Sequence, residues 1–268
     1  MKIRFGLLAV KNPIEKMFEV ASQSGISHIE IDLIKDHSYV ESFGLKRIAK
    51  IKNLAKKFDI SISLHIPYTI NPSDRIPMIR KANVEYLKKC ILLAHNLKAT
   101  HITTHLGYCN GLPSWDWMRK QALDRLVLSL EEILPLCKKY DVILAFENVN
   151  PMPKDSEFFY LGDNMRDLDY LYGRIKTPFF KLCLDTGHAN TNEGPMRYLR
   201  KFRDKIVAIH VHDNKGKYDE HLAIGEGNID WKNFSKELKR IKFYGPYISE
   251  VFSRTPKETR EDFEKYSR

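Results

Sequence analysis

Short runs of hydrophobic residues, many of them β-branched, alternate along the chain with longer segments in which hydrophobic residues recur every three to four positions. The short runs predict strands, and the longer segments predict amphipathic helices, for example over 75–97 and 119–140. Eight strands are predicted, at 3–9, 28–34, 60–66, 100–106, 142–148, 179–185, 206–212 and 246–252. A helical segment follows each of them. This alternation predicts βα units arranged around a parallel sheet.

The number of these units indicates the fold class. Eight βα units predict an α/β protein built as a (β/α)8 TIM barrel, and the 268 residues are close to the ~250 typical of such barrels. A doubly wound open sheet is the alternative, but no G-x-G-x-x-G motif follows the first predicted strand. No Gly/Ser linker, low-complexity segment or block of charge divides the sequence. A single domain over 1–268 is therefore expected.

Composition adds expectations about compartment and partners. No stretch reaches the ~18 uncharged apolar residues of a membrane helix, and the opening MKIRFGLLAV is too short for a signal peptide. A cytoplasmic protein without a membrane partner is therefore expected. The four cysteines form no CxxC pair, which favours reduced thiols. The net charge of +10 permits nucleic-acid or phosphorylated partners, although lysines scattered over amphipathic helices would give the same total.

Acidic residues and histidines stand at the ends of six consecutive predicted strands. In KLCLDTGHAN (181–190), a hydrophobic run ends in Asp185, and His188 follows. The third to eighth strands carry His65, His105, Glu147, Asp185, His210 and Glu250, and the loop after the seventh strand adds Asp219 and His221. In a (β/α)8 barrel the carboxyl ends of all strands meet at one mouth. We therefore expect these side chains to converge.

Such a convergence predicts a metal site. A single histidine at a strand end is an ordinary structural residue, but several buried carboxylates and imidazoles need a cation between them to offset repulsion and lost hydration. Histidine and carboxylate ligands without a thiolate suit Zn²⁺, Mn²⁺, Co²⁺ or Fe²⁺ better than Mg²⁺ or Ca²⁺. We expect one to three divalent ions, with zinc or manganese the favoured identities.

The motifs around these residues resemble one known superfamily over nearly the whole chain. HIPYTIN at His65, HLG at His105, DTGH at 185–188 and DEHLAIGEG at 219–227 are similar to motifs of the xylose isomerase-like TIM barrels, which include sugar isomerases and epimerases and the endonuclease IV family of abasic-site nucleases. The epimerase resemblance implies one metal held by Glu147, Asp185, His210 and Glu250, with Glu147 and Glu250 also acting as acid and base. The nuclease resemblance implies three zinc ions held by His65, His105, Glu147, Asp185, His188, His210, Asp219, His221 and Glu250.

Several segments depart from the nuclease pattern. The chain reads DTGH where those nucleases read DTCH, and HVHDNK (210–215) where they read HLND followed by Ser or Ala and Lys. ENVNP (147–151) replaces ENTAGQG, and IKDHSYVESFG (34–44) lacks the Arg- and Gln-rich segment that such nucleases push into DNA. We therefore expect a metal-dependent isomerase or epimerase of a sugar or sugar phosphate, acting by proton transfer next to a carbonyl. An abasic-site endonuclease acting on DNA is the alternative. The complete ligand set disfavours a barrel that only stores metal.

Substrate contacts are expected from His188, Lys215 and Trp115. His188 would hydrogen-bond the substrate, and Lys215 would stand in for an arginine that some epimerases carry after the seventh strand. Trp115 would stack on a sugar ring or a base, or pack its loop over the barrel. His212 points the same way as His210, two residues earlier, and is an alternative ligand to it. The sequence is compatible with an oligomer and does not decide the oligomeric state.

Overall fold

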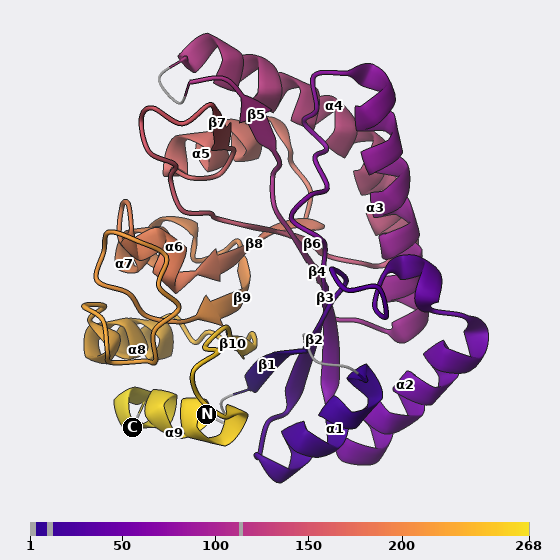
Figure 1. The fold of residues 1–268 in the computed structure, drawn as a ribbon, viewed down its shortest axis with the longest axis vertical. Helices are drawn as coiled ribbons and strands as arrows, with labels where there is room; N and C mark the ends of the chain where they lie inside the picture. Colours follow the sequence, from indigo (N-terminus) through magenta and orange to yellow (C-terminus); the bar gives the residue numbers. More distant parts are fainter. Residues whose placement is uncertain (1–3, 10–12, 113–114, 268) are drawn as a thin grey trace.

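A computed structural model describes residues 4–9, 13–112 and 115–267. Within them, eight parallel strands close into a barrel in the order β1-β10-β9-β8-β6-β4-β3-β2 (Figure 1). The strands are β1 (Phe5–Ala9), β2 (His28–Asp32), β3 (Ser61–His65), β4 (Ile102–Thr104), β6 (Leu144–Glu147), β8 (Phe180–Asp185), β9 (Ile206–Val211) and β10 (Tyr247–Ser249). Each lies inside a predicted strand, so the (β/α)8 TIM barrel is confirmed. Ile3, where the first predicted strand begins, lies outside the described residues.

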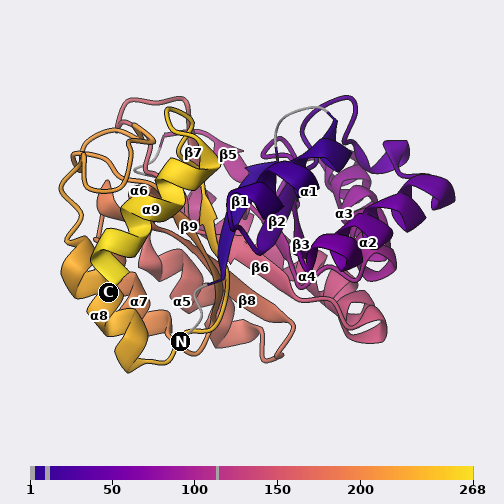
Figure 2. The same ribbon diagram turned by 90° about the horizontal axis from the view of Figure 1, so that it is seen from below.

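Helices cover the outside of the barrel. They are α1 (Ile14–Gln23), α2 (Leu45–Phe58), α3 (Pro77–Leu97), α4 (Asp116–Tyr140), α5 (Met165–Arg174), α6 (Thr186–Asn190), α7 (Pro195–Phe202), α8 (Trp231–Arg240) and α9 (Pro256–Ser267), with a short 3-10 helix, η1 (Val40–Ser42). Figure 2 shows α1–α4 on one side of the barrel and α5–α9 on the other. None of the described helices is long and apolar enough to cross a membrane.

Helix α9 packs over the seam where β1 meets β10. The ring of Phe263 lies 5.6 Å from that of Phe5 and 4.8 Å from that of Tyr247, and it also contacts Trp231. Phe263 is almost fully buried. This aromatic cluster therefore holds together strands from opposite ends of the sequence.

A two-stranded antiparallel sheet, β5 (Tyr108–Asn110) and β7 (Phe158–Tyr160), lies outside the barrel in the loops after β4 and β6 (Figure 1). This sheet was not predicted, because strands of three residues are too short to show an alternation of apolar and polar positions. Cys109 and Phe159 pair across it and are buried, which leaves Tyr108 and Tyr160 as a pair on the opposite face.

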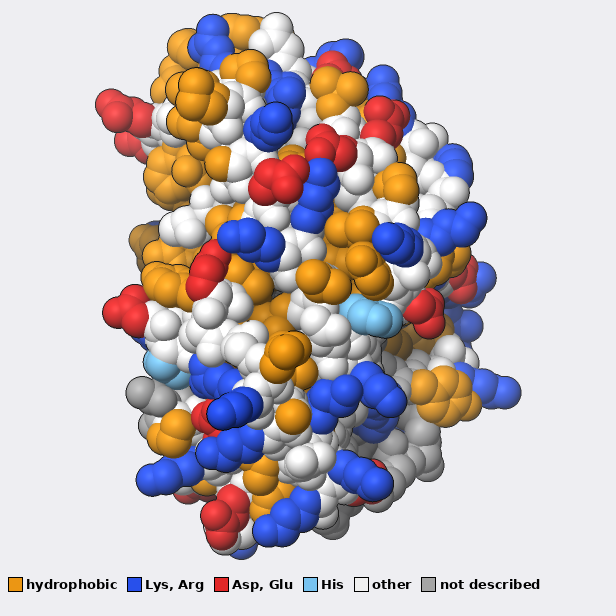
Figure 3. All heavy atoms as spheres, turned by 90° about the vertical axis from the view of Figure 1, so that its right-hand side faces the viewer, with side chains coloured by type: hydrophobic (Ala, Val, Ile, Leu, Met, Phe, Trp, Pro, Cys, Tyr) orange, Lys and Arg blue, Asp and Glu red, His pale blue; other side chains and the backbone are white. Residues whose placement is uncertain are grey.

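Basic side chains are spread over the outer faces of the helices. Figure 3 shows Lys and Arg on the side of α2 and α3, with acidic and hydrophobic side chains among them. Helix α2 alone exposes Lys46, Lys50, Lys56 and Lys57. The four cysteines are buried and free, and burial raises the pKa of Cys137 and Cys183 to about 12.

Candidate metal centre

The strand residues that point into the barrel form layers because alternate positions face the same side. A layer of mostly small residues comes first: Ser63, Thr103, Ala145, Cys183, Ala208 and Ile248. Two positions further along the same strands stand the predicted site residues: His65, His105, Glu147, Asp185, His210 and Glu250. The structure thus brings all six strand-end residues together at the mouth, and Glu147, Asp185, His210 and Glu250 are buried there.

Glu147 occupies the middle of this group. Its Oε2 atom lies 3.0 Å from Nε2 of His65 and 3.2 Å from Nε2 of His105, and its Oε1 atom lies 3.2 Å from Nδ1 of His210. Burial alone would raise the pKa of Glu147, but His210 and the other two histidines hold it well below its usual range. Burial alone would likewise lower the pKa of His65, yet the hydrogen bond to Glu147 raises it to about 9.

Glu250 joins the same group from the end of β10. Its Oε1 atom lies 3.0 Å from Nδ1 of His210, and although burial opposes ionisation, the charge of His210 lowers the pKa of Glu250 to about 2. Nδ1 of His210 thus faces the carboxylates of both Glu147 and Glu250. One proton on a nitrogen satisfies two anions poorly, whereas a divalent cation between them satisfies all three groups.

Asp185 and His188 are placed by the turn from β8 into α6. The Asp185 carboxylate caps this short helix by accepting a hydrogen bond of 2.6 Å from the His188 backbone N–H. Asn148 pairs with the Asp185 backbone through two hydrogen bonds of 2.9 Å. The segment DTGH therefore forms a strand end and a helix start in four residues, which directs both side chains toward Glu147.

Ligand atoms of His65, Glu147, His210 and Glu250 all lie within 4.8 Å of one another, as do those of Glu147, Asp185 and His188. His65 donates its Nδ1–H to the backbone oxygen of Ile66 at 3.0 Å, so its Nε2 atom is the nitrogen turned toward Glu147. This mixed nitrogen and carboxylate set fits a divalent transition metal.

Glu30, a fully buried residue of β2, was not among the predicted site residues. Its Oε2 atom lies 2.7 Å from Nε2 of His210, and its Oε1 atom accepts hydrogen bonds of 2.8 Å from Ser63 and Thr103. Burial alone would raise the pKa of Glu30, but His210 and His101 hold it well below its usual range. The sequence signal that could have identified Glu30 is that a carboxylate stands at a barrel-facing position of the otherwise mainly apolar run HIEIDLI (28–34).

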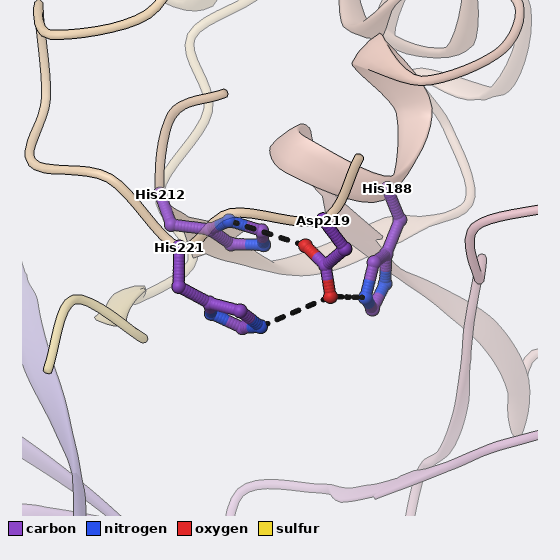
Figure 4. A group of neighbouring side chains, drawn as sticks. All are labelled: His188, His212, Asp219 and His221. Carbon is purple, nitrogen blue, oxygen red and sulfur yellow. Dashed lines mark hydrogen bonds and ion pairs between the residues drawn. The ribbon is translucent and has the colours of Figure 1, made fainter. Parts of the chain in front are cut away.

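A second group lies beside the first, in the loop after β9 (Figure 4). The Oδ2 atom of Asp219 lies 3.2 Å from Nε2 of His188 and 3.1 Å from Nε2 of His221, and its Oδ1 atom lies 3.7 Å from Nδ1 of His212. The structure thus brings together the predicted residues His188, Asp219 and His221, and it adds His212 to them. Nothing in the sequence pattern placed His212 in this group rather than in the first.

Two adjoining cavities open at the mouth. The first, of about 190 Å³, is lined by Leu8, Asp32, Ile34, His65, Tyr68, His105, Glu147, His188, His221 and Glu250. The second, of about 260 Å³, is lined by Tyr68, Thr69, Tyr108, Asn110, Phe158 and Tyr160. Tyr68 forms a wall of both. Among the residues that the structure describes, neither lining contains Lys or Arg.

Two predicted substrate contacts line neither cavity. Trp115 stands half-exposed at the start of α4, with its ring stacked 6.2 Å from that of Trp117. Lys215 is exposed in the loop after β9, where its backbone N–H donates to Glu220. Their roles stay predictions. His188 does line the first cavity.

A larger groove of about 580 Å³ lies between α7 and α8 and includes Arg197, Arg200 and Arg240 among its lining residues. None of the groups of possible metal ligands found among the described residues lies in it. The convergent carboxylates and histidines therefore place the candidate site at the barrel mouth rather than in this groove.

Comparison with known proteins is consistent with this geometry. Residues 18–267 match the family described as xylose isomerase-like TIM barrel. The chain belongs to this family. The resemblance drawn from the motifs is thereby confirmed.

Proteins similar to this chain are named for different activities. The chain is 34% identical to the uncharacterized protein MJ1614 of Methanocaldococcus jannaschii over 189 residues, 70% of each chain. It is 25% identical to a probable endonuclease 4 of Mycoplasmopsis synoviae over 234 residues, covering 82% of this chain and 76% of that one. Among solved structures, a D-tagatose 3-epimerase-like protein matches with a TM-score of 0.86 and 26% identity, covering 98% and 97% of the two chains.

Proposed function

We propose that this protein is a divalent-metal-dependent sugar isomerase or epimerase that moves a proton next to a carbonyl group. The observation that carries the proposal is the pair of buried carboxylates, Glu147 and Glu250, which approach Nδ1 of His210 at 3.2 and 3.0 Å and line a small cavity at the barrel mouth. The likeness to the D-tagatose 3-epimerase-like structure supports it.

The residues that would hold the catalytic metal are Glu147, Asp185, His210 and Glu250. When bound there, a divalent ion would polarise the substrate carbonyl and stabilise the negative charge left by proton removal. Zinc and manganese both suit these ligands.

Glu147 and Glu250 would carry the proton. One of the two, in its ionised form, would accept the proton from the substrate carbon, while the other would hold a proton in the same turnover. Inversion at carbon then requires the second carboxyl group to supply a proton to the opposite face, which is why two such groups at one carbon are needed. His188 lines the same cavity, but Nδ1 bonds the Asn148 backbone oxygen and Nε2 faces Asp219, so it would hydrogen-bond a substrate hydroxyl only where Nε2 holds no cation.

The cavity linings favour a neutral sugar as substrate. A phosphorylated substrate would be matched by Lys or Arg, and the described lining residues of the two cavities include neither. The aromatic faces of Tyr68, Tyr108 and Tyr160 instead suit the apolar faces of a sugar ring.

An abasic-site endonuclease acting on DNA is the second candidate. The group of His188, Asp219 and His221 beside the first favours it, because neighbouring metals can clamp a phosphodiester in two-metal hydrolysis. The likeness to the probable endonuclease 4 supports it as well.

One experiment separates the two candidates. Protein loaded in turn with Zn²⁺, Mn²⁺ and Co²⁺ is incubated in D₂O with a panel of neutral ketoses, and in parallel with a labelled duplex carrying an abasic-site analogue. Deuterium incorporation that is lost with chelator and in Glu147→Gln supports the isomerase or epimerase. Glu131→Gln, on the exposed face of α4, serves as control. Multiple-turnover strand cleavage without exchange would instead establish the nuclease.

A further inference from the structure

We propose that His212 is the fourth protein ligand of a second divalent-cation site, completed by His188, Asp219 and His221 (Figure 4). The set of nine ligands inferred from motifs gives this site three protein ligands and leaves His212 out. The proposal concerns cation binding, and counting bound ions tests it without assuming which reaction the neighbouring carboxylates perform.

The first support is that four side chains with possible metal-ligand atoms converge on one point. One ligand atom from each of the four side chains lies within 4.8 Å of the others. His188 comes from α6, whereas His212, Asp219 and His221 come from the end of β9 and the loop that follows. Figure 4 shows the three rings arranged around the Asp219 carboxylate.

The second support is the hydrogen bond at the far nitrogen of each ring. Nδ1 of His188 donates to the backbone oxygen of Asn148 at 2.9 Å, and Nδ1 of His221 donates to that of Glu250 at 3.0 Å. Nε2 of His212 lies 3.0 Å from the Asp185 carboxylate. When the rings are neutral, each carries its one N–H at the far nitrogen, so the near nitrogens can offer lone pairs to a cation beside Asp219. Outer partners of this kind are typical of metal-binding histidines.

The third support is a pair of unpartnered atoms. Nδ1 of His212 and Oδ1 of Asp219 are both buried without a hydrogen bond, and they lie 3.7 Å apart. Two ligand atoms ~2.0–2.2 Å from one tetrahedral zinc ion are ~3.3–3.6 Å apart, so a small shift of either side chain would let one ion bind both. The His212 side chain is fully buried, which makes an unpaired nitrogen costly.

The fourth support is the glycine behind the ring. A Cβ atom at Gly187 would lie 2.0 Å from Cε1 and 2.4 Å from Nδ1 of His212. A side chain at position 187 and the observed position of His212 therefore exclude each other. The two departures from the nuclease pattern, DTGH and HVHD, are thus one feature in space.

Four protein ligands change what the site can do. Three histidines and one aspartate fill a tetrahedral zinc shell, and closed shells of this kind are structural, whereas catalytic zinc keeps an open position. Such an ion would fasten the loop carrying Asp219 and His221 to α6, at the rim of the first cavity. It would leave no coordination position for a phosphate.

The test counts bound ions. After gel filtration, zinc-loaded His212→Asn should hold one ion per chain fewer than zinc-loaded wild-type protein. Gly187→Ala, which displaces the ring without removing a ligand, should lose the same ion. The control is His95→Asn on the exposed face of α3, which should hold as many ions as the wild-type protein. Circular dichroism checks that each variant is folded.

A second measurement needs no variant. Cobalt titrated into the wild-type protein should give the intense visible absorption of a tetrahedral ion for one equivalent, and x-ray absorption of that species should indicate three imidazoles. The proposal is overturned if His212→Asn or Gly187→Ala holds as many ions as the wild-type protein, with an unchanged cobalt spectrum. A wild-type protein that binds one ion, or that shows two imidazoles in the tetrahedral shell, would overturn it too.

Discussion

Nε2 of His210 lies 2.7 Å from Oε2 of Glu30, and both side chains are completely buried. Because Glu30 also accepts hydrogen bonds from Ser63 and Thr103, its carboxylate is fixed in place. It therefore sets the orientation of the His210 ring and turns Nδ1 toward Glu147 and Glu250. Glu30 acts through His210 and is a positioning residue.

Replacing Glu30 with glutamine should weaken binding of the catalytic metal ~10–100-fold, the usual cost of losing an outer partner of a ligating histidine. The amide keeps the shape of the side chain but lacks the charge that makes the imidazole a stronger ligand. Chelator competition with zinc measures the affinity, and the cobalt spectrum reports the geometry of the shell. Equal affinities for Glu30→Gln and the surface control Glu131→Gln would contradict this role.

Removing metal should destabilise the protein. A ligand that binds the folded state at 100 times its dissociation constant contributes ~2.7 kcal/mol to the free energy of unfolding. Thermal unfolding with and without chelator should therefore show a lower Tm for the stripped protein, restored by zinc. In His212→Asn, added zinc should raise the Tm by less than it does in the wild-type protein. An identical Tm with and without chelator would show that the described groups bind no metal tightly.

Arg119 should be a major contributor to stability. This buried side chain lies 2.8 Å from Asp163 and 2.6 Å from Asp167, and it stacks on Phe159 of the two-stranded sheet. Arg119→Met would leave two buried carboxylates unpaired, at a cost of ~3–5 kcal/mol in urea denaturation. Lys120→Met, which removes an exposed partner of Asp124, should cost less than ~1 kcal/mol. Similar losses in both variants would argue against the buried network.

Tyr68 should matter for substrate binding and little for folding, since it is half-exposed and forms a wall of both cavities. Tyr68→Ala should raise KM about 2- to 10-fold, the equivalent of ~0.5–1.5 kcal/mol of aromatic contact, with a smaller change in kcat. Steady-state kinetics on the ketose identified by deuterium exchange checks this. A loss confined to kcat would place Tyr68 in the chemical step instead.

Much of the site could be predicted because a parallel barrel imposes its own geometry. Once eight strands are predicted, the ends of all of them must meet, so His65, Glu147 and Glu250 are brought together by topology alone. The exact ends of the strands were predicted less well. The predicted strands include His105 and Glu250, whereas β4 and β10 end one residue before them, because the hydrophobic pattern continues past the last paired residue.

The missed features depend on pairings that no local pattern encodes. Glu30 is read as part of an apolar strand, and its partner His210 is 180 positions away. The alternation along the strand predicts that the His210 and His212 side chains point the same way. It does not predict that Nδ1 of His212 stays unpaired, because this depends on the contact of Nε2 with Asp185 and on the space left by Gly187. Such relationships are set by packing between strands.

The seam under α9 has a consequence for how the chain folds. Phe5 of β1 pairs with Tyr247 of β10, so the barrel closes only through a contact between residues more than 240 positions apart. At a synthesis rate of ~5–20 residues per second, β1 waits roughly 10–50 s for this neighbour. During that interval one edge of β1 is open to pairing with another nascent chain. The rate of barrel closure, rather than the stability of the finished fold, would then set the yield of native protein.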